Sequence, residues 1–318
     1  MILSQAIDSY ISLKRSLGAV YGAETRILRS FSRAMGPVPV DAIPAEACRL
    51  FCRGPGPPTR WWERKHYALR GFFAFLVSRG HRAGSPLPEP GPKIPPSFQP
   101  YIFSSQELQR LLDATAVLED KRSLLQPFTF RSLLVTLYGA GLRPSEGRRL
   151  RCCDVDFAQA LLLIWDTKFF QSRFVPIGAD LSRTLQSYAA TRRGLPLPDG
   201  PRSVFFASRT GRAIPLPTLE NAFVRLRAHA GIERPGGARR QPRLHDLRHT
   251  FAVHRLVAWY REGVDVQACL PLLATYLGHV NLSGTQTYLT MTSELLAEAS
   301  KRFEHYAAIG KEDNRHDR

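Results

Sequence analysis

Apolar residues recur every three or four positions through the first 82 residues, which is the spacing of amphipathic helices. Four helices are predicted there, the first around Ile7 to Leu17 and the others over residues 23–35, 44–52 and 59–79. Together they predict a small helical domain over residues 1–82 with a core of its own.

The fourth of these helices interleaves basic and aromatic side chains. Arg60, Arg64, Lys65 and Arg70 alternate with a set of aromatic residues: Trp61, Trp62, Tyr67, Phe72, Phe73 and Phe75. One face can therefore be buried while the basic side chains lie elsewhere. Such a helix suits contact with a polyanion, and it equally suits a bundle that only needs a soluble surface, so no base-contacting residue is assigned.

Residues 83–100 interrupt the helical pattern with a run of prolines, at positions 86, 88, 90, 92, 95, 96 and 100. Proline lacks a backbone N–H and favours the extended polyproline II conformation, with a rise of about 3.1 Å per residue. The segment is therefore predicted to be a semi-rigid linker between two domains.

Helical spacing returns after residue 101. Ser104 and Glu107 form a capping box at the start of one helix, and the apolar run from Phe128 to Tyr138 predicts another. Pro144 suits the first turn of the next helix, which puts Arg143 immediately before a helix start. Backbone N–H groups at such a position also face an anion.

Short apolar segments predict three strands, over residues 154–157, 160–165 and 172–177. The second and third strands form a hairpin with Lys168 at its flexible end. The fold class is therefore predicted to be mainly α with a small antiparallel β-sheet.

The composition of the chain indicates a polyanionic partner. The 318 residues include 44 Lys and Arg against 27 Asp and Glu, which gives a formal net charge of +17 and a pI of about 10.2. A basic excess of this size favours nucleic acid as the partner.

The cysteines and the hydropathy of the chain favour a cytoplasmic location for the protein. The cysteines lack the paired spacing of a zinc site, and their odd number argues against a disulfide framework: Cys48, Cys52, Cys152, Cys153 and Cys269. No apolar run reaches the roughly 18 residues that a membrane span needs, and the amino terminus lacks a basic signal region. We therefore expect a cytoplasmic protein that is neither exported nor anchored to a membrane.

The candidate chemistry is concentrated between Arg243 and Tyr288. His245 and Arg248 lie three residues apart on a predicted helix, so the imidazole and the guanidinium share a face and can bind one anion. Apolar residues further along would pack this helix into a core, which gives the site a rigid support.

Four short motifs occur in order along the chain. The first is Gly141-Leu-Arg-Pro-Ser-Glu146, and the second is Lys168 in the hairpin that ends with Val-Pro. The third is His245-Asp-Leu-Arg-His249, and the fourth is Leu277-Gly-His279 with the later Tyr288. In this combination the chain resembles the tyrosine recombinase (phage integrase) family.

The resemblance implies a SAM-like helical core-binding domain over residues 1–82 and an α+β catalytic domain over residues 101–310. It implies DNA cleavage by Tyr288, which would join the 3′-phosphate and release a 5′-hydroxyl without metal or ATP, so no cofactor is expected. The other implied roles are phosphate clamps at Arg143 and Arg248, proton transfer near the nucleophile at His245, the acid for the leaving oxygen at Lys168, a phosphate hydrogen bond at His279, and a supporting carboxylate at Glu146.

The resemblance also implies double-stranded DNA as substrate and a homo-oligomer, a tetramer on paired sites, with accessory recombinases or DNA-bending proteins as further partners. An apolar stripe from Leu295 to Ala307 predicts a last helix, which can dock on a neighbouring protomer or on its own domain. Residues 311–318 are expected to be disordered. The Arg- and Pro-rich composition suits a mobile-element enzyme, and integration, excision, transposition and resolution all stay open.

The sequence also allows other interpretations. A type IB topoisomerase-like enzyme would relax DNA by the same chemistry, and an accessory DNA-binding protein would keep only a vestigial catalytic set. Residues 245 and 249 have the histidine spacing of a zinc helix, but Asp246 replaces the usual glutamate and Arg248 would repel a cation. His249 and His254 are interpreted as core residues, and the rival nucleophiles are Tyr260, Tyr276 and Tyr306.

Overall fold

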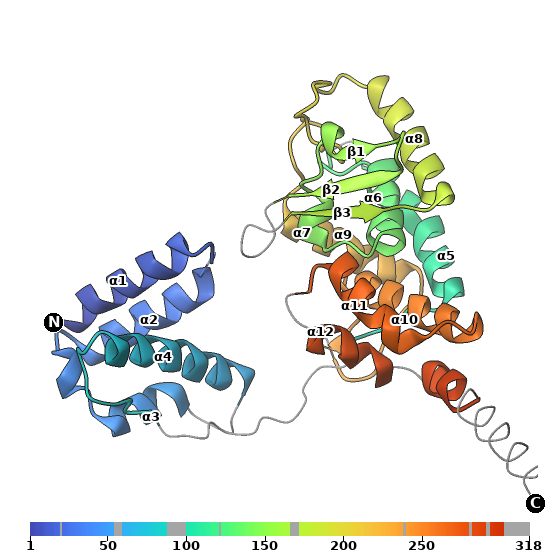
Figure 1. Cartoon of the computed structure of the whole chain (residues 1–318). Helices are drawn as coiled ribbons and strands as arrows, with labels where there is room; N and C mark the ends of the chain where they lie inside the picture. The colour runs from blue at the N-terminus through green and yellow to red at the C-terminus, as the bar shows by residue number, and fades with distance from the viewer. Residues whose placement is uncertain are drawn as a thin grey trace, which may run out of the picture. The chain divides into compact units, whose positions relative to one another are not determined.

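A computed structural model of the chain describes residues 1–19, 21–53, 59–87, 100–120, 122–165, 172–237, 240–279, 282–290 and 293–301. The chain divides into two compact units, with the boundary between Leu87 and Pro100 (Figure 1). Each unit has an apolar core of its own.

The first unit is helical. Its elements are α1 (Leu3–Ser16), α2 (Gly22–Met35), a 3-10 turn (Val40–Ala42), α3 (Ala45–Arg53) and α4 (Arg60–Ser78). Their apolar faces meet in one cluster that includes Leu3, Leu28, Phe31, Phe72 and Phe73. The helices predicted from apolar spacing are all present, with ends that differ by a few residues.

Helix α4 uses part of its basic surface to hold the first unit together. Arg64 forms an ion pair with Glu24 of α2 at 3.1 Å. The Lys65 ammonium donates to the Phe51 carbonyl of α3 at 2.7 Å. These two basic residues therefore have structural roles in addition to any role at the surface.

The second unit opens with α5 (Ser105–Asp113), a 3-10 helix (Ala114–Leu118), α6 (Pro127–Gly139) and α7 (Pro144–Gly147). The predicted capping box is present at α5. The Glu107 N–H donates to the Ser104 hydroxyl at 3.2 Å, and the Ser104 N–H donates to the Glu107 carboxylate at 2.8 Å.

Three antiparallel strands follow, in the order β1 (Val155–Asp156), β2 (Leu161–Ile164) and β3 (Arg173–Pro176). Leu161 pairs with Pro176 and Ile164 with Arg173, which is the register of a β2–β3 hairpin. The hairpin end that carries Lys168 lies outside the described residues.

The rest of the second unit is helical, with α8 (Ala179–Arg193), α9 (Leu216–His229), α10 (Asp246–Arg261), α11 (Val266–Leu277) and α12 (Ser283–Gln286). A 3-10 turn at Thr287–Thr290 follows α12, and residues 293–301 are again helical. Among the helices in the described ranges, none is both long and apolar enough to cross a bilayer. The prediction of a mainly α fold with a small antiparallel sheet is confirmed.

Helix α10 connects two buried clusters of the second unit. Leu247, in its first turn, belongs to the cluster formed with α6, α8 and α9. Phe251 and Leu256, further along, belong to a separate cluster that also contains Leu273 of α11 and Tyr288. Because its turns are buried in different clusters, α10 cannot rotate without opening one of them. The residues at its start are therefore held rigidly.

Gly141 joins α6 to α7 in a left-handed conformation, with φ +59°. A Cβ there would lie 2.5 Å from a ring carbon of Phe251 and 3.0 Å from a methyl carbon of Leu277. We expect Gly141→Ala to lower the free energy of unfolding by about 3 kcal/mol, because backbone strain and overpacking add. Denaturant unfolding measures this loss.

The matched control for Gly141→Ala is Gly263→Ala. Gly263 also has a positive φ, of +74°, but nothing lies within 4 Å of the position of its Cβ. Its loss should be only about 1 kcal/mol, the strain alone. Equal losses in the two variants would show that the tight contact at Gly141 has no energetic consequence.

Candidate active site

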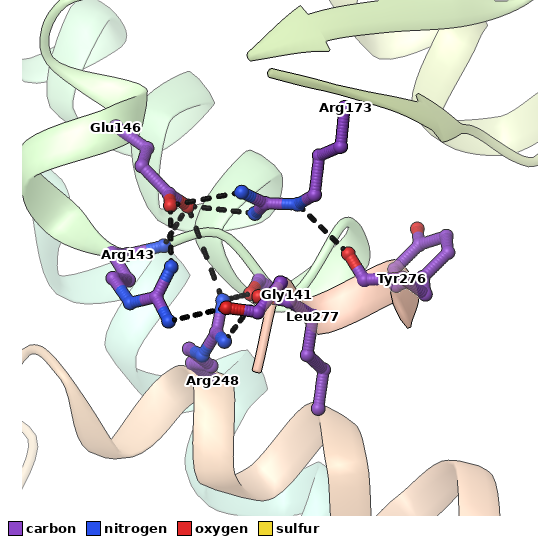
Figure 2. Close-up of polar contacts among 8 residues, drawn as sticks. Gly141, Arg143, Glu146, Arg173, Arg248, Tyr276 and Leu277 are labelled. Atoms are coloured by element: carbon purple, nitrogen blue, oxygen red, sulfur yellow. Dashed lines mark hydrogen bonds and ion pairs between the residues drawn. The ribbon is translucent and has the colours of Figure 1, made fainter. Parts of the chain in front are cut away.

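A single carboxylate, that of Glu146, lies at the centre of a group of arginines (Figure 2). Glu146 ends the first turn of α7, where its Oε2 accepts a hydrogen bond from the Arg143 backbone N–H at 2.9 Å. Its Oε1 accepts from the Arg143 guanidinium at 2.7 Å. Both the backbone and the side chain of Arg143 are therefore fixed by one acid.

Arg173, the first residue of β3, holds the same carboxylate. Its terminal nitrogens donate to Oε1 and Oε2 of Glu146 at 3.0 and 2.9 Å, and its Nε donates to the Tyr276 carbonyl at 2.9 Å (Figure 2). This arginine was not among the site residues predicted from the sequence. Strand alternation was the available signal, because Arg173 shares a strand face with the buried Val175 while Phe174 is exposed.

Arg248 is the most deeply buried arginine of the group, with 2% of its side chain exposed. Its guanidinium donates to the Gly141 carbonyl at 2.8 Å and to the Leu277 carbonyl, and one of its nitrogens lies 3.9 Å from Glu146 Oε2. These contacts join α10 to the α6–α7 turn and to the end of α11. Burial and the charge of Arg143 lower the pKa of Arg248 to about 10, so the guanidinium stays charged at neutral pH.

The arginines outweigh the cost of burying the Glu146 carboxylate. Burial alone would raise the pKa of Glu146, but the hydrogen bonds and charge of Arg173, together with the contacts from Arg143, lower this pKa to about 2. Glu146 is therefore ionised at neutral pH, and its charge offsets the mutual repulsion of the arginines.

His279 follows Gly278, the left-handed C-cap of α11 at φ +67°. The Gly278 carbonyl accepts from the Arg143 guanidinium at 3.0 Å. The His279 Nδ1 is hydrogen-bonded to the Thr285 hydroxyl at 2.8 Å. This bond fixes the ring and makes Nε2 the nitrogen that can face a ligand.

Tyr288 is buried, with 2% of the residue exposed. Its ring lies against that of His279, with centroids 6.1 Å apart, and its hydroxyl is hydrogen-bonded to the His249 Nδ1 at 3.0 Å. Burial raises the pKa of the Tyr288 phenol, although the charges of Arg248 and Arg143 lower it in part.

His249, interpreted as a core residue, has a contact that the sequence did not predict: its imidazole is hydrogen-bonded to the Tyr288 hydroxyl. Helical spacing alone could not reveal this, since the contact comes from a residue far along the chain. His254, in contrast, has a hydrogen-bond partner away from Tyr288: its Nδ1 lies 2.9 Å from the Tyr138 hydroxyl.

His245 occupies the N-cap position of α10, and its ring centroid lies 5.0 Å from that of His249. With Arg143 and Arg243 it lines a groove of about 580 Å³ that is also lined by residues of α9. Burial, followed by the neighbouring His249 and arginines, lowers the pKa of His245 to about 3.

The predicted site residues that the structure describes come together from four chain segments: Arg143, Glu146, His245, Arg248, His279 and Tyr288. Lys168 and the rival nucleophile Tyr306 lie outside the described residues. The rival Tyr276 donates its hydroxyl to the Pro176 carbonyl at 3.0 Å. Within the described ranges, no group of three or more His, Cys, Asp or Glu is arranged to hold a metal ion.

Comparison with known proteins identifies the family of the chain. A sequence model described as the phage integrase family matches residues 102–294. A protein of Sinorhizobium fredii, y4rB, assigned as an integrase/recombinase, is 34% identical over 304 residues, which cover 94% of this chain and 96% of that protein. The tyrosine recombinase XerA of Thermococcus onnurineus is 32% identical over 237 residues, 74% of this chain and 72% of its own.

The chain belongs to the phage integrase family. These matches confirm the enzyme class expected from the sequence, a tyrosine-type site-specific DNA recombinase, and they do not favour the topoisomerase-like or accessory alternatives.

Solved structures confirm the fold of this phage integrase family member. The Tn1549 transposon integrase in complex with transposon right end DNA has a TM-score of 0.70 at 16% identity, over 96% of this chain and 100% of that one. A lambda integrase dimer bound to a COC′ core site has a TM-score of 0.65 at 15% identity, over 92% of this chain and 97% of its own. At this identity the likeness concerns the fold alone.

The histidines of this phage integrase site are neutral at pH 7. Burial, and then the charges of nearby arginines, lowers the pKa of His279 to about 4, and His245 is lowered further. The pKa of His249 is also about 4, because burial and Arg243 outweigh the opposing charge of Asp246. At neutral pH the positive charge of the site therefore comes from its arginines.

A pH dependence of stability follows from these histidines. Each has a folded pKa below its ordinary value of 6.5, so the unfolded chain binds more protons in this range. Their contribution to the free energy of unfolding is complete above pH 6.5 and is lost as the pH falls toward 4. Denaturant unfolding from pH 7.5 to 4.5 should show this decline, and a His279→Asn variant should show a shallower one. Stability that stayed constant over this interval would contradict the buried, neutral histidines.

The charge balance of the site is tested by Glu146→Gln. The variant leaves Arg143, Arg173 and Arg248 without their common counter-ion, so we expect a loss of about 3 kcal/mol in the free energy of unfolding. The matched control is Glu294→Gln, because Glu294 pairs with Arg261 at 2.6 Å while 54% of its side chain is exposed. That variant should lose less than about 1 kcal/mol. Similar losses in both variants would contradict a central role for Glu146.

Proposed function

We propose that this recombinase cleaves and rejoins double-stranded DNA through a covalent bond between Tyr288 and a 3′-phosphate. One observation carries the proposal: a buried tyrosine is in contact with two histidines and lies within the electrostatic reach of two arginines that share one carboxylate. This arrangement combines a nucleophile with fixed positive charge, which is what phosphodiester cleavage requires.

Arg143 and Arg248 clamp the phosphate in this proposal. A guanidinium matches two phosphate oxygens with parallel N–H groups, whereas an ammonium presents only a point charge. Arg143 is the more accessible of the two, with 32% of its side chain exposed, while Arg248 is fixed from within the core. The DNA therefore meets one partly exposed and one buried guanidinium, both held by contacts within the protein.

The reaction exchanges one phosphoester for another. The Tyr288 oxygen forms a bond to phosphorus as the bond from phosphorus to the 5′-oxygen breaks, and Lys168 protonates the leaving oxygen. His279 donates from Nε2 to a non-bridging oxygen, since Thr285 fixes its Nδ1. His245 assists proton transfer near the nucleophile. The phosphotyrosine bond conserves the energy of the original ester, so religation needs no ATP.

Residues 1–82 act as the core-binding domain and residues 101–310 as the catalytic domain, joined by a linker over residues 83–100. The net charge of +17 supports DNA as the partner, and the lambda integrase and Tn1549 integrase structures contain bound DNA. We further propose a cytoplasmic enzyme that acts as a tetramer on paired sites, with the helix after Tyr288 as a candidate contact between protomers.

Covalent trapping on nicked suicide duplexes tests the nucleophile. The duplexes are drawn from the DNA that flanks the gene, and loss of a short 5′-hydroxyl fragment prevents religation. We expect a denaturant-resistant adduct with the wild-type protein and none with Tyr288→Phe, because phenylalanine has no attacking oxygen.

Tyr276→Phe is the matched control for this experiment, since Tyr276 is the nearby rival whose hydroxyl is bound to the Pro176 carbonyl. It should retain the adduct. An adduct that survives Tyr288→Phe and disappears in Tyr276→Phe would overturn the assignment.

A further inference from the structure

The Tyr288 hydroxyl has a histidine partner that the resemblance did not assign. The His249 Nδ1 lies 3.0 Å from this hydroxyl, and the two ring centroids are 5.6 Å apart. We propose that His249, backed by Asp246, is the general base that takes the proton of Tyr288 when the phenol attacks phosphorus. The inference rests on the proposed function, since it requires Tyr288 to be the nucleophile.

Asp246 places a negative charge beside this imidazole, at a distance beyond that of a hydrogen bond. It lies three residues before His249 on α10, is fully buried, and has an oxygen 4.0 Å from the His249 Nε2. The carboxylate is held by Arg243, whose backbone N–H and guanidinium donate to it at 2.8 and 3.1 Å. A negative charge beside Nε2 favours the tautomer with its hydrogen on Nε2. Nδ1 then carries the lone pair that accepts from Tyr288.

The order Asp246, His249, Tyr288 reproduces the logic of an acid, base and nucleophile triad. A buried carboxylate acts on an imidazole through its charge, and the imidazole is hydrogen-bonded to an oxygen that must lose its proton. Here two members lie on consecutive turns of one rigid helix. The third reaches them from the 3-10 turn after α12.

His245 is less well placed for this proton. Within the described structure, the histidine hydrogen-bonded to the Tyr288 hydroxyl is His249. The His245 ring contacts that of His249 edge-on at 5.0 Å, and His245 lines the groove beside Arg143 and Arg243. His245 can therefore assist proton transfer only from beside His249, which is the histidine in contact with the Tyr288 hydroxyl.

The charge around His249 suits a base that must be neutral before the reaction. Burial lowers its pKa to about 4, Asp246 opposes this effect, and Arg243 and Arg248 add to it. A bound DNA phosphate brings negative charge to the same place, which raises the basicity of the imidazole at the time of attack.

Each proton that moves in the proposed reaction is exchanged between a side chain of the site and a reacting oxygen. As the bond between the Tyr288 oxygen and phosphorus forms, the phenolic proton moves to Nδ1 of His249 and Asp246 stabilises the imidazolium. The 5′-oxygen leaves with a proton from Lys168. In religation the same proton returns from His249 to the departing Tyr288 oxygen, and the 5′-hydroxyl returns its proton to the lysine.

Single-turnover cleavage of the suicide duplex tests the proposal with two variants. His249→Ala removes the base, and His249→Asn keeps a hydrogen-bond acceptor that cannot take up a proton. Both should slow adduct formation at pH 7 by about 10²- to 10⁴-fold. The control is His254→Ala. His254 lies on α10 like His249, and this variant removes its hydrogen bond to the hydroxyl of Tyr138 on α6. It should cleave at close to the wild-type rate.

Two readouts separate a base from a merely structural residue. Burial raises the pKa of Tyr288 above its ordinary value of 10, so without a base the reactive phenolate increases about tenfold per pH unit. The cleavage rate of both variants should follow this slope between pH 7 and 9, while the wild-type rate changes little. Added imidazole should also restore cleavage by His249→Ala. Thermal unfolding of each variant verifies that it is folded.

The proposal is overturned if folded His249→Asn cleaves at the wild-type rate, since His249 would then only position the tyrosine. It is also overturned if either variant lacks the steep pH slope, if imidazole gives no rescue, or if His254→Ala is equally slow. If Tyr288→Phe still forms the adduct, the proposed nucleophile fails as well. A wild-type adduct that is lost in Tyr288→Phe but unchanged in His249→Ala overturns the base alone.

Discussion

The charge balance around Glu146 is the constraint on which the candidate site depends. One carboxylate, 8% exposed, is shared by Arg143, Arg173 and Arg248, which come from the N-cap of α7, from β3 and from α10. Without it, a site with this much positive charge would repel itself, and burial of Arg248 would lack compensation. With it, the arginines are fixed before any DNA binds, so the enzyme does not have to order them during the reaction.

The same network sets the position of the remaining groups. Arg143 and Arg248 donate to the carbonyls of Gly278 and Leu277 at the end of α11, which is where His279 begins its loop. Arg173 reaches the carbonyl of Tyr276 one residue earlier. The end of α11, from Tyr276 to Gly278, is therefore held by the same arginines that share Glu146. These hydrogen bonds explain how residues from distant parts of the chain can form one site with well-defined positions.

Much of the site was predictable from the sequence because motif residues are spaced by local structure. The i, i+3 relation of His245 and Arg248 follows from a helix, and Arg143 before Pro144 follows from helix-start chemistry. The contacts of Arg173 and His249 could not be predicted in this way, because they are tertiary contacts with Glu146 and Tyr288. Strand alternation gave a weak signal for Arg173. For His249, an apolar helix and a neighbouring histidine fitted a core position equally well.

Mapping the trapped adduct shows directly whether Tyr288 becomes covalently linked to DNA. Digestion with nuclease and trypsin should leave a nucleotide on the peptide of residues 262–301, which contains both Tyr276 and Tyr288 but not Tyr260. Fragmentation in the mass spectrometer then separates the two tyrosines. We expect a nucleotide linked through its 3′-phosphate to Tyr288. A nucleotide on Tyr276, or on any residue outside this peptide, would contradict it.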